Sequence, residues 1–320
     1  MNRQVESKGN SNETGRTIGI AIEEPEIVHR TKIRWTEFTW NPMSGCEAVS
    51  PGCTFCYART LAERLRGTAA FPNGFDLTSR PHKLTEPMKL KEPSFIFVDS
   101  MSDFFLDAVD DTYRDQIIDV IESTPQHQYQ VLTKRHESML RYSRRRRLPA
   151  NFWAGVTAED QARAGLRIPC VLQVDVPVRF VSVEPALSLV DISGWVSGKN
   201  NAAGGDGLQW VIWGGESGLH LKDEKVRAVR GCAVRDERGK WSPHPERMDW
   251  PRTLRDVCAA NGIPFFFKQW GGARPTSAGH ELDGRKWEEI PDVQAKAMQE
   301  AVGRVERATS PSGGWGASPR

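Results

Sequence analysis

Short apolar runs alternate with segments of helical periodicity through most of the chain. Each run is rich in β-branched and aromatic residues, and its last residues turn abruptly polar. The six clearest runs occupy residues 95–103, 129–135, 152–160, 179–185, 210–218 and 264–272. Strands that are apolar throughout and alternate with helices indicate a parallel sheet covered on both faces.

The first part of the chain adds a strand and a helix around a loop. Residues 31–42 are rich in aromatic and β-branched residues and predict a strand that ends at Pro42. Residues 56–67 have apolar residues at helical spacing, and Gly67 can end that helix. Residues 75–80 are a candidate eighth strand.

Two architectures fit this pattern, a (β/α) barrel that need not be complete and a doubly wound sheet. Both place chemistry at the carboxyl ends of the strands. Here six separate strands end in polar residues, which suits the mouth of a barrel better than a single crevice. We therefore expect an α/β protein with an incomplete (β/α) barrel and a functional loop after the first strand.

A single domain is expected to span residues 30–290. It has two predicted insertions, a glycine- and asparagine-rich one at about 198–207 and a charged one at 219–247. A hairpin is predicted to turn at Asp283-Gly284. The polar leader and the Ser-, Gly- and Pro-rich tail are expected to be disordered, at residues 1–29 and 303–320.

Composition limits the class of protein. A chain of 320 residues can bury a core without disulfide staples. Its net charge of +2 gives no general argument for nucleic acid as a partner, although local basic patches remain. No apolar run reaches the roughly 18 residues of a membrane span, and the N-terminal residues lack the apolar centre of a signal peptide. We expect a cytoplasmic protein with reduced thiols and no membrane partner; the oligomeric state stays open.

Three of the six cysteines lie close together, where Cys46, Cys53 and Cys56 form a C-x6-C-x2-C motif. Thiols at this spacing in a chain without secretory signals suggest a metal or iron–sulfur centre before a disulfide. Three protein ligands, with no histidine nearby, leave one coordination position for another molecule. The residues allow a [4Fe–4S] cluster with an open iron, a zinc site completed by a distant residue, or a loop without metal.

Seven motifs follow one another between about Lys32 and Trp287: KIRWTEFTWNPMSGC, SPGCTFCYA, FVDSMSDFF, QVLTKR, VSVEP, GGESG and PFFFKQWG. In this order they resemble a phage-associated family of unknown function that is known by its three-cysteine motif (DUF5131-type). That family is described as similar to radical S-adenosylmethionine enzymes. Those enzymes normally have C-x3-C-x2-C with an aromatic residue before the last cysteine. Phe55 fits that place, whereas the first spacing here is six.

The resemblance implies that the three cysteines hold a [4Fe–4S] cluster and that S-adenosylmethionine chelates its open iron. A reducing protein would supply the electron that cleaves the sulfonium, while the barrel orients the substrate and excludes water. The expected function is an enzyme that modifies a nucleotide or nucleic acid in a phage or mobile-element context. The alternatives are a zinc-stabilised nucleic-acid-binding or phage accessory protein without radical chemistry, and a metal-free nucleotide or sugar enzyme.

Polar residues at the strand ends are the candidate site. Glycines let backbone amides approach a ligand, and carboxylates accept hydrogen bonds from hydroxyl or amino groups. The cofactor-binding candidates are Gly214, Gly215, Glu216, Ser217, Ser182 and Glu184. The substrate-binding candidates are Asp99, Ser102, Asp103, Lys134, Arg135 and Gln269. The candidates for catalysis are Glu184, Glu216 and Lys268. The basic pair Lys134-Arg135 favours a phosphate-bearing substrate, but these charges could equally form a structural ion-pair network.

Four consecutive arginines at 144–147 allow a nucleic-acid contact, in which each neutralised phosphate adds salt-dependent affinity. We prefer the interpretation of a solvated helix end, where cations suit the helix dipole. Cys170 and Cys258 lie in apolar helical contexts and are interpreted as core residues.

Overall fold

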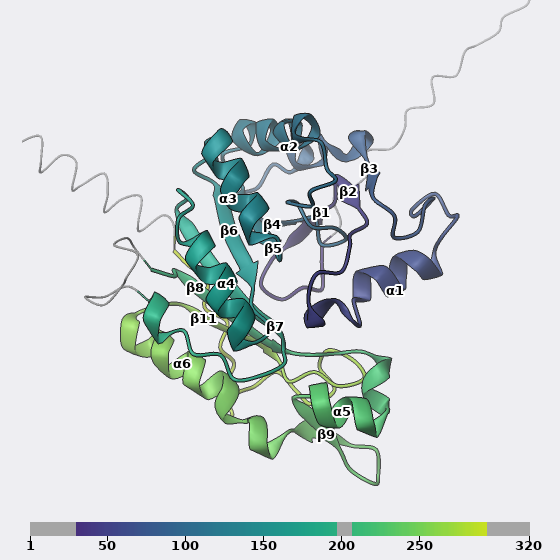
Figure 1. The fold of residues 1–320 in the computed structure, drawn as a ribbon, viewed down its shortest axis with the longest axis vertical. Helices are drawn as coiled ribbons and strands as arrows, with labels where there is room; N and C mark the ends of the chain where they lie inside the picture. Colours follow the sequence, from purple (N-terminus) through teal and green to yellow (C-terminus); the bar gives the residue numbers. More distant parts are fainter. Residues whose placement is uncertain (1–29, 197–206, 293–320) are drawn as a thin grey trace, which may run out of the picture.

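The computed structural model describes residues 30–196 and 207–292 (Figure 1). The predicted leader 1–29, the predicted tail 303–320 and all but the last residue of the predicted insertion 198–207 lie outside the described residues.

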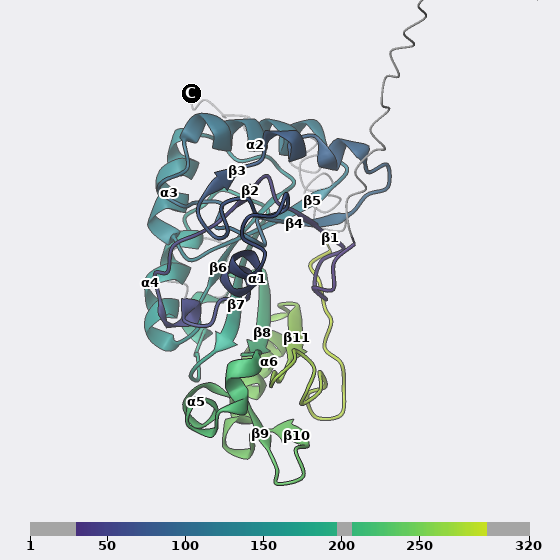
Figure 2. The ribbon, with the colours of Figure 1, turned by 90° about the vertical axis from the view of Figure 1, so that its right-hand side faces the viewer.

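Seven parallel strands form one sheet, and their order in space follows their order in the chain. They are β1 (Phe38–Trp40), β4 (Phe95–Val98), β5 (Gln128–Thr133), β6 (Phe152–Thr157), β7 (Val178–Ala186), β8 (Trp210–Gly215) and β11 (Phe265–Gln269). Figure 2 shows the sheet turning between β4 and β8, as in a curled sheet. Within the described ranges β1 and β11 do not pair. The predicted incomplete (β/α) barrel is confirmed, and the doubly wound alternative is wrong because the strand order never reverses.

Helices cover the outer face of this sheet (Figure 1). They are α2 (Asp111–Ser123), α3 (His136–Arg145), α4 (Gln161–Val171) and α6 (Asp249–Asn261). Local chemistry sets their ends: the carboxylates of Asp110 and Asp160 cap α2 and α4 by accepting hydrogen bonds from backbone N–H groups. Gly262 ends α6 in the left-handed conformation, with φ of 64°.

The two faces of the sheet bury different side chains. The outer face packs aliphatic and aromatic residues together against the helices in the main core. The inner face holds a separate cluster dominated by aromatic rings, formed by Trp35, Phe97, Trp153, Val178, Phe180, Trp210, Ile212 and Phe266. Aromatic side chains therefore fill part of the inside of the half-barrel, and a cavity remains toward the carboxyl ends of the strands.

Residues 75–80 do not form the eighth strand predicted for them. Their short strand β3 (Thr78–Ser79) pairs antiparallel with β2 (Met43–Ser44) in a separate two-stranded sheet. The loop before the first cysteine holds these residues, since Arg80 N also donates to Pro42 O at 2.8 Å beside the β2–β3 pair. The predicted turn at Asp283-Gly284 is present: both residues have positive φ, and Leu282 and Arg285 pair across it.

The charged segment 219–247 is folded. It contains α5 (Glu224–Arg230) and a two-stranded hairpin of β9 (Ala233–Arg235) and β10 (Trp241–Pro243). Figures 1 and 2 place this segment beside the carboxyl ends of the strands, next to the start of α1 (Tyr57–Arg64).

Candidate functional site

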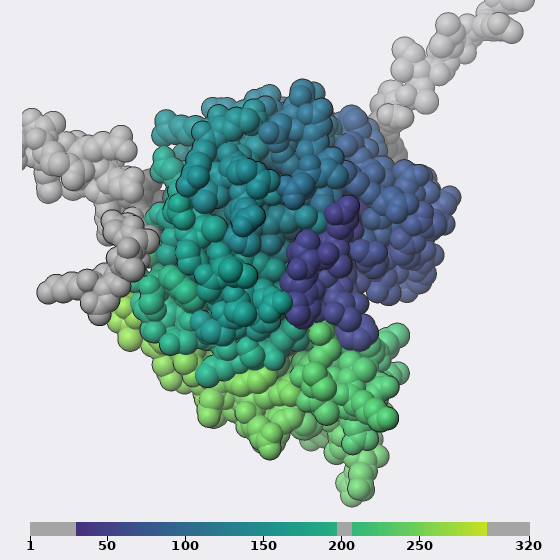
Figure 3. Space-filling view, in the orientation of Figure 1, coloured from purple at the N-terminus to yellow at the C-terminus, as the bar shows by residue number. Residues whose placement is uncertain are grey.

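A cavity of about 530 Å³ opens at the carboxyl ends of the strands. The three cysteines of the motif line it together with residues from the strand ends. All the candidate site residues named from the sequence line it except Arg135 and Gly214. Figure 3 shows the segment that carries the cysteines, at the purple end of the described chain, lying between the main body and the green insertion. The strand-end residues are thus brought together as predicted, and their roles stay proposals.

The cysteines lie on the connection from β1 to α1, which also contains the short helix η1 (Pro51–Cys53). All three are free thiols and partly exposed. Burial, with a contribution from the nearby Asp103 carboxylate, raises the pKa of the Cys46 thiol to about 11. Among the described residues, no three His, Cys, Asp or Glu side chains form a group able to hold one metal ion as they stand.

The start of this connection is fastened to the loop after β4. Gly45 donates a backbone hydrogen bond to Met101 O at 2.9 Å, and Ser102 Oγ donates to Gly45 O at 2.7 Å. Gly45 has φ of 94°, and a Cβ there would lie 2.4 Å from Asp76 O. Only glycine allows the chain this close approach.

The middle of the connection is held by a buried ion pair. Gly52 N–H donates to Glu159 Oε1 at 3.2 Å, and Arg167 Nη1 donates to Glu159 Oε2 at 2.6 Å. Burial acts to raise the pKa of Glu159, but Arg167 and Ser50 outweigh it and leave the pKa lowered. Glu159 is therefore a fixed carboxylate that positions the backbone between the first two cysteines.

The insertion holds the same turn from the other side. Arg230 of α5 forms two 2.6 Å hydrogen bonds to Glu216, and its Nη2 donates to Pro51 O at 3.1 Å. Its guanidinium also lies 5.2 Å from the ring centroid of Phe55, which stacks on His220 at 3.9 Å. We call Glu216, His220 and Arg230 the clamp. Because Phe55 lies between Cys53 and Cys56, the clamp fixes the segment that carries these two thiols.

Replacing Arg230 with methionine is expected to lower the free energy of unfolding by about 3 kcal/mol, because Glu216, only 5% exposed, would lose its partner. The cysteine segment should also loosen, so that alkylation of Cys53 and Cys56 becomes several times faster. Urea unfolding and mass-mapped alkylation rates measure the two effects. The control is Arg238→Met, at an exposed site in the same insertion. Unchanged alkylation rates in the Arg230 variant would show that the clamp does not hold the segment.

Asp99 is the most unusual acidic residue of the cavity. It lies directly after β4, is 3% exposed, and has φ of 58°, which is strained for a residue other than glycine. Its Oδ1 accepts a hydrogen bond from Met43 N, whereas its Oδ2 has no partner among the described residues. Burial raises the pKa of Asp99 well above its usual value.

Replacing Asp99 with asparagine is expected to stabilise the protein at neutral pH and to change little near pH 4. With a raised pKa in the fold, the native state keeps a proton that the unfolded chain releases. The wild type therefore loses stability as the pH rises above the ordinary range of aspartate, by about 1.4 kcal/mol per unit of pKa difference. Melting temperatures of both proteins between pH 4 and 8 test this. Parallel curves would contradict it.

The neighbouring polar residues are engaged with one another. Asp103 accepts hydrogen bonds from Thr133 Oγ1 at 2.6 Å and from Lys134 N at 3.0 Å, and so joins the ends of β4 and β5. Arg135 lies 3.6 Å from Asp107 and 3.8 Å from Glu47 in ion pairs. Of the basic pair, Lys134 lines the cavity and Arg135 does not.

On the other side of the cavity, Glu184 at the end of β7 forms an ion pair with Lys268 of β11. Gly214 leaves room for this pair, since a Cβ there would lie 3.1 Å from the Glu184 carboxyl carbon. Gly215 is required for packing, because a Cβ would lie 2.1 Å from Trp270 O. Gln269 Nε2 donates to Gly215 O at 3.4 Å.

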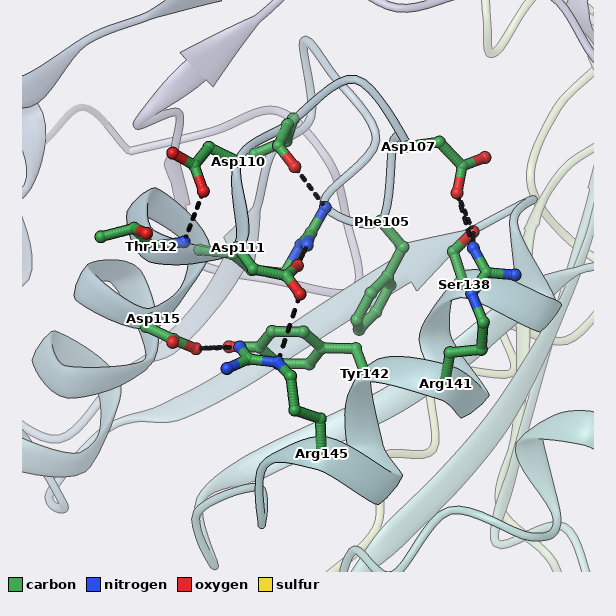
Figure 4. Close-up of polar contacts among 12 residues, drawn as sticks. Phe105, Asp107, Asp110, Asp111, Thr112, Asp115, Ser138, Arg141, Tyr142 and Arg145 are labelled. Carbon is green, nitrogen blue, oxygen red and sulfur yellow. Dashed lines mark hydrogen bonds and ion pairs between the residues drawn. The ribbon is translucent and has the colours of Figure 1, made fainter.

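The arginine run at the end of α3 lies away from this cavity. Figure 4 shows Arg145 facing Asp111 and Asp115 of α2, with Tyr142 Oη donating to Asp115 at 2.6 Å. Arg146 pairs with Asp119 at 2.6 Å. Acidic side chains of α2 engage these two arginines, so they join α3 to α2 instead of only ending a solvated helix, as the preferred interpretation had it.

Several residues that shape the site are absent from the sequence-based candidates. Trp35 lines the cavity from the segment before β1, although it is only 2% exposed. Glu159, Arg167 and Arg230 position the cysteine segment. Glu159 follows a strand end, which is a signal that could have found it. No sequence signal marks Arg230, because it lies in a segment without periodicity.

Fold and site together define a parallel α/β half-barrel with a three-cysteine segment at the carboxyl ends of its strands. The chain belongs to the family described as protein of unknown function (DUF5131), whose model matches residues 30–238 and 232–291. The family resemblance seen in the motifs is thereby confirmed.

Solved structures of spore photoproduct lyase are similar to this chain. A cysteine-to-serine mutant has a TM-score of 0.47 and 11% identity, covering 77% of this chain and 78% of that chain. A double mutant with bound AdoMet and dinucleoside spore photoproduct has a TM-score of 0.46 and 10% identity, with the same coverage. Scores below 0.5 establish nothing about the chemistry of this chain. No curated protein sequence matches it.

Among the residues that the structure describes, no helix has the length and apolarity needed to cross a membrane.

Proposed function

We propose that this protein is a radical S-adenosylmethionine-like enzyme that holds a [4Fe–4S] cluster on Cys46, Cys53 and Cys56. The observation that carries the proposal is that three free thiols from one connection line the cavity at the carboxyl ends of the parallel strands. This donor set fits the group: three thiols supply three iron ligands and leave one iron open. Ligands of a cubane bind different irons, so their sulfurs need not crowd around a single ion.

Bound there, the cluster and S-adenosylmethionine would supply one-electron cleavage of the sulfonium. The chain's own residues bind, orient and exclude water. We assign to cofactor binding the residues Gly214, Gly215, Glu216, Ser217, Ser182 and Glu184. Since Arg230 holds both oxygens of Glu216, the contribution of Glu216 is to fix the position of its strand end. The ion pair of Glu184 and Lys268 is the group best placed to hold or pass a proton at the cavity wall.

A nucleotide or nucleic acid is the proposed substrate. Lys134 supports it, because this basic residue lines the cavity and no ion pair of its side chain is found among the described residues. Asp99, Ser102, Asp103 and Gln269 complete the proposed substrate side of the cavity. The cytoplasmic location, the reducing protein and the phage context belong to the same proposal.

Anaerobic purification with iron and sulfide reconstitution tests the cluster. We expect roughly four irons per chain, a brown and oxygen-sensitive protein, and an electron spin resonance signal after reduction that changes when S-adenosylmethionine is added. Stoichiometric zinc and no iron from an iron-replete anaerobic preparation would overturn the proposal and leave the zinc-stabilised binding protein. Iron binding without any response to S-adenosylmethionine would reject the radical chemistry.

A further inference from the structure

We infer that the inner part of the cavity binds the base of a nucleoside monophosphate, with its phosphate at Lys134. The inference rests on the proposed function and narrows its substrate to a ligand of defined chemistry: an uncharged planar heterocycle that bears a single phosphate group.

The wall of the inner cavity is aromatic and apolar. Trp35, Phe97 and Leu132 line it. The rings of Trp35 and Phe97 pack with centroids 4.7 Å apart, and Trp210 meets Trp35 edge-on at 6.0 Å. Rigid aromatic walls of this kind favour a flat ring system over a flexible polar chain. The body of the ligand is therefore expected to be planar and apolar on its faces.

Three buried polar atoms of the residues that line this cavity lack partners among the described residues. They are Trp35 Nε1, Asp99 Oδ2 and Ser182 Oγ, on residues that are 2%, 3% and 0% exposed. A buried polar atom that stays unpaired gives up the hydrogen bond it would make in water. Three such atoms around one cavity are explained most simply if a ligand supplies their hydrogen bonds.

The chemistry of these atoms describes the edge of the ligand. The indole N–H of Trp35 can only donate, so it requires an acceptor. The hydroxyl of Ser182, which this inference moves from the cofactor side of the cavity to the substrate side, can donate or accept, as can the Asp99 carboxyl when it holds a proton. A hydrocarbon offers these atoms no hydrogen bonds, and a fully charged group is costly to bury in an apolar cavity. The edge of a nucleobase does, because it carries neighbouring donors and acceptors.

Lys134 favours a ligand that carries a negative charge. It follows β5 directly and is partly buried, whereas Lys268 pairs with Glu184, Arg34 pairs with Glu288, and Lys32, the remaining basic lining residue, is exposed to solvent. In the described parts of the chain Lys134 has no such partner, and an ammonium is a common partner of phosphate. A planar heterocycle that carries hydrogen-bond donors and acceptors on its edge and is linked to a phosphate is a nucleotide.

Isothermal titration of the full-length chain with nucleoside 5′-monophosphates tests the inference. The protein is used both metal-free with reduced thiols and after reconstitution. We expect at least one monophosphate to bind with Kd on the order of 100 μM or tighter. Trp35→Phe, which keeps an aromatic ring but removes the N–H, and Ser182→Ala should each weaken binding at least fivefold. Ser182→Ala should not lower the melting temperature, because it removes an unpaired polar atom. Trp35→Phe leaves space in the packed inner cluster and should lower it modestly, so its binding is measured well below its own melting temperature.

Lys134→Met should weaken binding of the monophosphate at least tenfold and that of the parent nucleoside less than twofold. The matched control is Lys240→Met, at an exposed position of the insertion. The inference is overturned if no monophosphate binds at millimolar concentration, if inorganic phosphate binds equally well, or if the three variants bind like the wild type. It is also overturned if they weaken S-adenosylmethionine alone, because the unpaired atoms would then serve the cofactor. Metal analysis separates the proposals: monophosphate binding without iron rejects only the cluster.

Discussion

Replacing Cys53 with serine is expected to reduce the iron bound after anaerobic reconstitution from roughly four per chain to less than one. Serine preserves the size of the side chain but gives up the thiolate, and two remaining cysteines cannot hold three corners of a cubane. Cys53 lies between the Glu159 contact to Gly52 and the Phe55 stack, so the backbone around it is held on both sides. Iron and sulfide per chain, with the spin resonance signal of the reduced protein, measure the effect.

The matched control is Cys170→Ser. Cys170 is a free thiol on α4 that does not line the cavity, and it is partly exposed, so the interpretation of Cys170 as a core residue is wrong, whereas Cys258 is buried as expected. It should retain the iron content of the wild type. A Cys53 variant that also retains it would refute the assignment of the three cysteines as ligands.

Replacing Arg167 with methionine is expected to lower the free energy of unfolding by about 3–5 kcal/mol. The Glu159 and Arg167 side chains are 0% and 5% exposed, so removal of the cation leaves a buried carboxylate without its partner. Arg167 also donates to Thr157 O at 2.7 Å, and that acceptor would lose a bond. Equilibrium unfolding in urea measures the change. Because Arg167 and Ser50 keep the pKa of Glu159 low, this stabilisation is present at neutral pH and is lost in acid, as Glu159 becomes protonated.

Two further variants make this result interpretable. Glu159→Gln combined with Arg167→Met removes the isolated charge and should recover part of the loss, which a double-mutant cycle quantifies. Arg163→Met on the same helix removes a pair that is 33% exposed on the arginine side and should cost about 1 kcal/mol or less. An Arg167 variant as stable as the Arg163 variant would contradict the buried-pair argument.

The sheet could be predicted because buried parallel strands carry a strong signal. All six residues of β6 and all six of β8 are buried, so each strand reads as an unbroken apolar run. The pairing of β2 with β3 could not be predicted, because two-residue strands carry no period. The cysteine segment they border is positioned by contacts from β4, α4 and the insertion, none of which is local.

The positions of the candidate site could be predicted, but the state of each side chain could not. Asp99 and Asp103 follow the same strand, yet Asp103 accepts two hydrogen bonds from the next strand end while one Asp99 oxygen has no partner among the described residues. Glu216 is engaged by Arg230, which lies 14 residues further along the chain. Which strand-end groups remain free for a ligand depends on these partners, and partners are set by the fold.

The clamp has a consequence for the order of events during synthesis. The contact between Arg230 and Pro51 joins residues 179 positions apart. While the ribosome is still making the middle of the chain, the cysteines have already emerged but the arginine that steadies them does not exist. Metal delivered at that stage would encounter a flexible cysteine segment whose thiols are accessible to oxidation. Productive loading is therefore expected only after translation has passed α5, and a prematurely terminated chain should be a poor acceptor of iron even though it contains all three thiols.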